Sequence, residues 1–239
     1  MEATMTNVGR LIDLISFRRD RFCLVADVFA CESSKETVTQ MIAQASSFNS
    51  ELDDGSIEAA LNRGLASLTN DDMATFARKT RTEYARLFLG PRTVVAPLHE
   101  SAYLSGTPRM FTSDTLAVRA FLERHGYVMK AKNLEPEDSV GVEFEFLRNI
   151  CDRCISLLEI EGGDAAGEVG RLLEAQEAFE EQHMGRWLPE FAERVVDGDQ
   201  SGFYAAWATY LIGVLGEDDA LLRECKSLLV EMGRLVEMA

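Results

Sequence analysis

The chain of 239 residues is 46% hydrophobic and 27% charged, which is typical of a globular protein with a substantial core. Lys and Arg number 24 against 40 Asp and Glu, so the formal net charge is −16. This charge disfavours nucleic acid and anionic lipid as partners and favours cationic ones, although acidity also serves solubility alone.

No run approaches the roughly 20 consecutive apolar residues that a membrane span requires. The N-terminal apolar stretch, residues 11–15, is interrupted by Asp13 and followed by a charged run at 18–21. Arg18 and Arg19 do not form an export signal, because no apolar stretch and no cleavage site follow them. We therefore expect the protein to stay in the cytoplasm.

Apolar residues recur at helical spacing, and sustained apolar–polar alternation is absent, so we predict an all-α protein of about nine or ten helices. The first helix is marked by Val8, Leu11, Ile12, Ile15, Phe22, Val25 and Phe29. Ser33 and Glu36 have the spacing of a capping box and are expected to open a second helix, which extends to about Phe48.

A third helix is predicted over about residues 56–68. Thr69 or Asn70 is expected to cap a fourth helix, which ends at Gly90. Residues 91–112 hold three of the five prolines and are expected to form a long irregular loop, a kind of segment that is often functional.

A helix that starts at Ser113 or Asp114 is expected to end at His125, before a glycine typical of helix C-termini. After a connection over residues 127–135, Pro136 is predicted to occupy the first turn of the next helix. Its end is expected at the glycine pair of residues 162–163.

Further helices are predicted at about 165–184, 187–197, 199–215 and 218–237, with Gly198 and Gly216 at the later boundaries. We expect one helical domain over residues 1–239, with residues 127–136 as a candidate hinge between two sub-bundles.

Five cysteines, an odd number, are expected to be reduced thiols. Cys151 and Cys154 have the spacing of a redox or metal site, but no second pair and no nearby His accompanies them. Three-residue spacing also places two small apolar side chains on one buried helix face, and we favour this structural interpretation.

The sequence contains no pattern typical of an enzyme. Gly162-Gly163 lacks the Lys and the Ser or Thr of a phosphate loop, the three histidines are isolated, and no Ser lies in a nucleophile elbow. We therefore expect no catalysis, no metal and no cofactor.

Residues 84–91 are a candidate binding segment. Tyr84 pairs with Leu87 and Phe88 at the spacing of adjacent helical turns. The Gly-Pro pair that follows ends the helix and could leave this aromatic edge at the mouth of a groove. The alternative is that all three side chains fill the core, as large apolar side chains usually do.

Residues 135–138, with the sequence Glu-Pro-Glu-Asp, are the second candidate segment. Glu135, Glu137 and Asp138 cluster at a predicted helix N-terminus, where they could simply stabilise the helix dipole. The functional alternative is an acidic rim that receives a cationic peptide.

Taken together in chain order, these motifs resemble the TorD/DmsD-like chaperones, which have the nitrate reductase assembly chaperones as relatives. The motifs are aromatic-x-x-Leu-Phe-x-Gly-Pro at 84–91, a loop with Tyr103, Glu-Pro-x-Asp at 135–138, and His-x-x-x-Trp-x-Pro-x-Phe at 183–191. The resemblance spans about residues 70–215. It implies an all-helical chaperone without a prosthetic group. Such a chaperone binds the twin-arginine leader of a molybdenum-containing oxidoreductase and delays export until the bis-pterin molybdenum cofactor is inserted.

The resemblance also assigns residues. Those expected to bind the leader are Tyr84, Leu87, Phe88, Glu135, Pro136, Glu137, Asp138 and Ser139. Those expected to support the site are Gly90, Pro91, Tyr103, His183 and Trp187. The family commonly has His at the position of Ser139; Ser can cap a helix or donate a hydrogen bond but carries no pH-sensitive charge. We therefore expect leader affinity or partner choice to differ here.

The chemistry of such a leader agrees with this interpretation. A basic start followed by an apolar stretch needs carboxylates beside an apolar groove, so the two segments should line one cleft. The charge of −16 should speed the encounter with such a leader.

Two alternatives remain open for the function. One is a related chaperone that grips a non-exported oxidoreductase subunit, and the other is an enzyme such as a nucleotide hydrolase. The protein is expected to meet the membrane only through the export machinery, as a monomer or a domain-swapped dimer.

Overall fold

The structure, a computed structural model, describes residues 2–30, 34–48, 55–68, 72–90, 94–105, 111–129 and 136–237. Within these ranges it contains ten α-helices and no named strand, which confirms the predicted all-α class. No helix of the described part combines the length and the apolar character that a membrane crossing requires.

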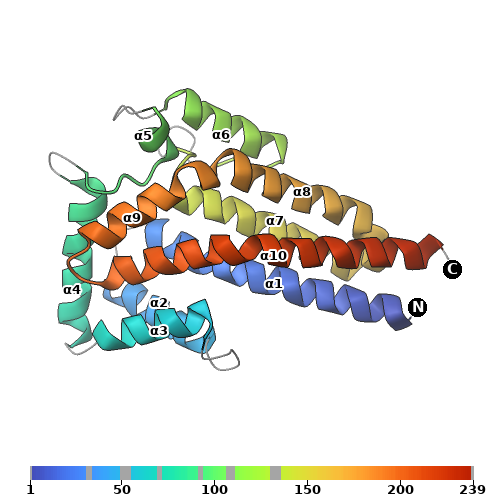
Figure 1. Ribbon diagram of the computed structural model, residues 1–239, viewed down its shortest axis with the longest axis horizontal. Coiled ribbons are helices and arrows are strands. Elements are labelled where there is room, and N and C mark those ends of the chain that lie inside the picture. Colours follow the sequence, from blue (N-terminus) through green and yellow to red (C-terminus); the bar gives the residue numbers. More distant parts are fainter. Residues whose placement is uncertain are drawn as a thin grey trace.

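Four long helices run alongside one another and form the body of the molecule (Figure 1). They are α1 (Glu2–Ala30), α7 (Val140–Glu161), α8 (Ala166–Gln182) and α10 (Phe203–Glu237). Helix α1 packs most extensively against α7 and next against α10. The start of α1 and the end of α10 lie together at one end of the bundle (Figure 1).

The shorter elements gather at the other end and along one side (Figure 1). At the far end lie α2 (Lys35–Phe48), α3 (Ile57–Leu68), α4 (Met73–Tyr84) and α9 (Leu188–Gly198). Helix α6 (Ser113–Arg124) lies beside α8, and α5 (Glu100–Leu104) packs against α6 and α9. A π-helical turn, η1 (Ala85–Leu89), continues α4, and the 3-10 turns η2 (Gly162–Ala165) and η3 (Met184–Arg186) flank α8.

A buried ion pair fixes the long helices relative to one another. Arg18 of α1 donates from Nε and Nη2 to the two carboxylate oxygens of Asp218 of α10, at 2.8 and 2.7 Å. Its Nη1 donates to Gln176 of α8 at 2.9 Å, and that amide donates to the carbonyl oxygen of Leu147 of α7 at 2.8 Å. Both charges are buried, so removing either partner should lower the free energy of unfolding by about 3–5 kcal/mol.

The cysteine pair lies in this core. Cys151 and Cys154 are fully buried on α7, and burial raises the pKa of the Cys151 thiol to about 12. The side chain of Gln176 donates to the Cys151 sulfur at 3.2 Å. A protonated, inaccessible thiol has little redox reactivity, so the geometry favours the structural interpretation of the pair.

Two predicted helix starts are displaced in the structure. Helix α4 is capped by Asp72, whose side chain accepts from the amides of Ala74 and Thr75, while the predicted caps at 69–70 lie outside the described residues. Pro136 does not open α7. That helix begins at Val140 with Ser139 as its cap, because Asp138 and Val140 are hydrogen-bonded to the segment before α5 and Ser139 pairs with His99.

The other corrections concern loops and the last helix. The long loop predicted at 91–112 contains the short helix α5. Most of the candidate hinge, residues 130–135, lies outside the described residues, as does Ser33. The predicted break at Gly216 is wrong, because α10 continues through it to Glu237. Helix α10 packs against α1, α3, α8 and α9. This packing stabilises the helix by more than one glycine in its interior destabilises it.

Two glycines of α10 give opposite predictions for stability. Gly216 is exposed and a Cβ there would meet no atom within 4 Å, so Gly216→Ala should raise the free energy of unfolding by roughly 0.5–1 kcal/mol. At Gly213 a Cβ would lie 2.9 Å from Cγ2 of Ile57, so Gly213→Ala should lower it. Urea denaturation of both variants checks this, and a destabilised Gly216→Ala would mean that α10 is not continuous there.

Candidate functional site

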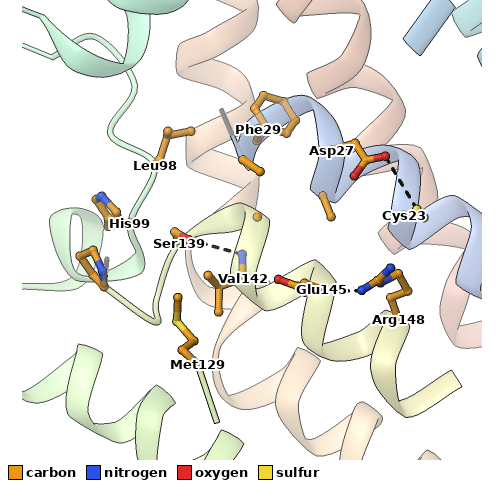
Figure 2. Close-up of a pocket in the computed structure, with 14 residues that line it drawn as sticks. Cys23, Asp27, Phe29, Leu98, His99, Met129, Ser139, Val142, Glu145 and Arg148 are labelled. Atoms are coloured by element: carbon orange, nitrogen blue, oxygen red, sulfur yellow. Dashed lines mark hydrogen bonds and ion pairs between the residues drawn. The ribbon is translucent and has the colours of Figure 1, made fainter. Parts of the chain in front are cut away.

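A cavity of about 440 Å³ opens between the last turns of α1 and the first turns of α7; we call it the α1–α7 pocket. Figure 2 shows its lining, which comes from α1, α7, the segment before α5 and the turn before α7. The labelled residues are Cys23, Asp27, Phe29, Leu98, His99, Met129, Ser139, Val142, Glu145 and Arg148. The pocket therefore combines apolar walls with charged and polar groups.

Close helix packing forms the base of this pocket. A Cβ at Gly141 would lie 3.1 Å from the Cα and 3.3 Å from the Cβ of Ala30. The first turn of α7 can approach the end of α1 this closely because Gly141 has no side chain. The pocket opens beside this contact, where Ala26 and Val142 add apolar surface.

The turn before α7 is attached to the segment before α5. The amide of Val140 donates to the carbonyl oxygen of Leu98 at 3.0 Å, and the amide of Glu100 donates to that of Asp138 at 2.8 Å. Residues 99 and 139 consequently form an isolated antiparallel bridge. Oδ2 of Asp138 also accepts from the amide of Ser101 at 2.9 Å. These bonds hold both segments at one wall of the pocket.

Behind this wall lies a buried polar cluster of Glu100, Asp138, Glu143, His183 and Trp187. Nδ1 of His183 lies 3.0 Å from Oε2 of Glu100, and Nε1 of Trp187 donates to Oε2 of Glu143 at 3.2 Å. Oδ1 of Asp138 and Oε1 of Glu143 are buried without a hydrogen-bond partner among the described residues. Within the described ranges, no group of three His, Cys, Asp or Glu could hold a metal ion.

The predicted aromatic edge is not at the surface. Tyr84 and Phe88 are 3% and 5% exposed and Leu87 is fully buried, so the expectation that these side chains face a groove is wrong. The Phe88 ring packs on Phe29 at 5.9 Å and on Phe191 at 6.2 Å between centroids. All three side chains belong to the hydrophobic core, where Tyr84 packs on Tyr204 of α10 and Phe88 packs on α1 and α9.

The predicted acidic rim is also occupied by internal partners. Glu137 accepts two hydrogen bonds from Arg119 of α6, at 2.7 and 2.9 Å. Asp138 is 0% exposed and caps the start of α5. Neither carboxylate is open to a peptide, so the expectation of a rim formed by these acids is wrong. Glu135 lies outside the described residues.

Two residues of the predicted turn do line the pocket, namely Pro136 and Ser139. The hydroxyl of Ser139 accepts from the amide of Val142 at 3.4 Å and so caps α7. The two segments are thus joined through Phe29, which lies against Phe88 on one side and lines the pocket on the other.

The predicted supporting residues have defined contacts. Gly90 adopts a φ of 43°, which favours glycine, and its amide closes η1 by donating to Ala85 at 2.7 Å. The hydroxyl of Tyr103 donates to the carbonyl oxygen of Pro97 at 2.9 Å, and its ring packs on Trp187 at 5.3 Å. Pro91 lies outside the described residues.

Sequence reasoning missed the charged residues of the pocket, Asp27, Glu145 and Arg148. Asp27 interrupts the apolar end of the first helix, and Glu145 and Arg148 fall outside the apolar stripe of α7. That pattern places them on the outer faces of their helices. It cannot show that these faces meet, because more than a hundred positions separate the two helices.

Burial and the charges of Glu100 and Asp138 raise the pKa of Glu143 well above its ordinary value. The folded chain therefore keeps a proton that the unfolded chain releases above about pH 4.3. This contribution to stability is complete below that pH and is lost as the pH rises toward the raised pKa.

Glu143→Gln removes the titration and keeps an acceptor for Trp187. Its free energy of unfolding should match that of the wild type near pH 4.5 and exceed it at pH 8, because only the wild type loses stability as the pH rises above the ordinary pKa of a glutamate. Urea denaturation across this range measures the difference, with exposed Glu193→Gln as control. A difference that does not change with pH would contradict the assignment of a proton to Glu143.

A sequence model of the family described as nitrate reductase delta subunit matches residues 50–193. Chaperone protein TorD of Vibrio cholerae serotype O1 (strain M66-2) is 27% identical over 218 residues, 87% of this chain and 92% of that protein. The probable Tat proofreading chaperone DmsD of Haemophilus influenzae is 26% identical over 133 residues, 56% of this chain and 57% of that protein. The fold is also similar to a crystal structure from Archaeoglobus fulgidus, which is described as that of a redox enzyme maturation protein. The two structures superpose with a TM-score of 0.50 at 18% sequence identity, and the match covers 81% of this chain and 92% of the other. These similarities confirm the resemblance to TorD/DmsD-like chaperones, and the chain belongs to the nitrate reductase delta subunit family.

Proposed function

We propose that this protein is a maturation chaperone for a molybdopterin oxidoreductase and that it binds the twin-arginine leader of that enzyme in the α1–α7 pocket. The family and the relatives named as chaperones support the general role. The observation that carries the site is the pocket itself, because Pro136 of the Glu-Pro-x-Asp motif and the adjoining Ser139 form part of its wall. Its volume of about 440 Å³ lies in the range of natural ligand pockets.

The two kinds of lining match the two parts of such a leader. Phe29, Leu98 and Met129 offer apolar surface to the hydrophobic stretch. Asp27 and Glu145 offer carboxylates to the arginines, and this pairing is strongest where it is bidentate. In this proposal the carboxylates of α1 and α7 take the role first expected of Glu137 and Asp138.

The motif aromatics have an indirect role in this proposal. Tyr84 donates from its hydroxyl to the carbonyl oxygen of Phe29 at 3.3 Å, and Phe88 packs edge-on against the Phe29 ring. The amides of Val95 and Ala96 donate to the carbonyl oxygen of Leu87 at 3.1 and 3.0 Å. The motif thus supports the apolar wall from behind and anchors the segment that leads to Leu98.

The proposal places the chain in the cytoplasm, where the leader is held before export, and assigns it no catalytic step and no cofactor of its own. The net charge of −16 supports it, because long-range attraction accelerates the encounter with a cationic peptide. Contact with the membrane would be indirect, through the export machinery.

Calorimetry with a twin-arginine leader peptide tests this function. We expect the wild type to bind and Leu98→Ala to weaken binding by about tenfold, since roughly 1.4 kcal/mol of apolar contact is lost. The matched control is Leu116→Ala, which removes the same atoms from an exposed position of α6 outside the pocket.

Two results would contradict the proposal. One is the absence of binding by the folded wild type. The other is equal weakening by Leu98→Ala and Leu116→Ala. A peptide in which both arginines are replaced by Lys provides a further comparison. Unchanged affinity for it would favour a chaperone that recognises a non-exported partner.

A further inference from the structure

Arg148 is the single basic side chain among the residues that line the described α1–α7 pocket, apart from His99. Its Nη2 donates to Oε1 of Glu145 at 3.4 Å, and the side chain is 35% exposed. Its Nε is buried and has no hydrogen-bond partner among the described residues. The guanidinium is thus held within the pocket by weak contacts.

Other ion pairs of the chain show how weak this contact is. Arg119 donates two hydrogen bonds to Glu137, at 2.7 and 2.9 Å. The buried Arg18 donates two to Asp218, at 2.8 and 2.7 Å. Charge-assisted bonds normally measure about 2.7–2.9 Å, so the 3.4 Å contact of Arg148 is well outside that range. Of these three arginines, Arg148 is the one that another cation could displace most easily.

Asp27 lines the same pocket from α1, and its side chain points toward Cys23 (Figure 2). Its carboxylate accepts a weak hydrogen bond from the Cys23 thiol at 3.8 Å. Burial raises the pKa of Asp27, the charge of Arg148 lowers it, and the charge of Glu145 raises it, so all three charges act on one another. Among the described residues Arg148 forms an ion pair with Glu145 and Asp27 forms none, so these three side chains carry one net negative charge that a ligand cation could pair with.

We propose that Arg148 occupies, in the free chain, the place that a leader arginine takes in the complex, so that it acts as a built-in competitor for Asp27 and Glu145. This rests on the proposed function, because it assumes that the leader enters the α1–α7 pocket. On binding, the ligand guanidinium pairs with the two carboxylates and Arg148 turns toward solvent on its flexible stem. A ligand cation must displace Arg148 before it can pair with the two carboxylates. A cation that pairs weakly with carboxylates therefore binds less tightly than an arginine does.

This proposal predicts that removing one charged side chain from the pocket tightens the binding of the leader. Arg148→Gln should tighten binding of a twin-arginine leader peptide by about threefold to tenfold, because the competitor is removed and both acids remain. Asp27→Asn should weaken binding by about tenfold for the loss of one charge pair. Arg148→Lys keeps the charge but loses the planar fork and should lie between the wild type and Arg148→Gln. Calorimetry on the full chain at about 0.15 M salt measures all three affinities.

Matched controls separate local from long-range effects. Asp13→Asn makes the same change on α1 about 21 Å along the helix from Asp27. Arg223→Gln makes the same change as Arg148→Gln at an exposed position of α10. Both should leave the affinity unchanged, because charges beyond about 8 Å are largely screened at this salt concentration. Thermal unfolding of each variant confirms that the chain remains folded.

The outcomes distinguish this proposal from the one on which it rests. If the wild type binds the peptide but Arg148→Gln weakens binding or behaves like Arg223→Gln, Arg148 is not a competitor. If Asp27→Asn behaves like Asp13→Asn, Asp27 does not receive the ligand cation. Absence of binding by the folded wild type and by Arg148→Gln would overturn both proposals together.

Discussion

The attachment of residues 98–101 to the turn before α7 is the constraint on which the site depends. Two backbone hydrogen bonds and the Asp138 side chain join segments that are about forty residues apart in the chain. The attachment places Leu98 and His99 opposite α1, and it delays the start of α7 until Val140. Without it the pocket would lack one wall, and the buried acids behind that wall would be exposed to water.

The buried polar cluster explains why the motifs that suggested a binding site occur together. His183 and Trp187 contact Glu100 and Glu143, and Asp138 holds the chain beside Glu100. Motifs that are far apart in the sequence therefore meet in the interior rather than at a surface. Burying carboxylates without full compensation is costly, and here it fixes one arrangement of α5, α7 and the turn after α8. The motif residues organise the pocket, and less prominent residues line it.

The sequence allowed the fold class and most helix positions to be predicted, because they depend on local periodicity. Most of the apolar stripe of the first helix is buried as its spacing indicates, with Leu11, Ile15, Phe22, Val25 and Phe29 in the core and Val8 and Ile12 partly buried. Predictions failed where tertiary contacts outweighed local preference. Gly216 remains helical within the packed α10, and Pro136 lies before α7 because the residues that follow it are bonded to the segment before α5.

The candidate site could be predicted only in part for the same reason. Pro136 and Ser139 line the pocket, but Glu137 and Asp138, the acids expected to bind the leader, are bonded to partners inside the chain. Whether a carboxylate forms a rim or an internal ion pair depends on a partner such as Arg119, eighteen positions upstream on another helix. Asp27 and Arg148 belong to no motif, and only the packing of α1 against α7 brings them to the same pocket.

The central claim is that a leader peptide occupies the α1–α7 pocket rather than another apolar surface. One competitor is an apolar groove of about 330 Å³ between α9 and α10, lined by Val196 and Ile212 among others. Photo-crosslinking with a twin-arginine leader that carries a diazirine in its apolar stretch distinguishes the two surfaces. We predict that mapped crosslinks fall within residues 23–30, 98–99 and 136–148. Crosslinks concentrated on α9 and α10 would contradict this account.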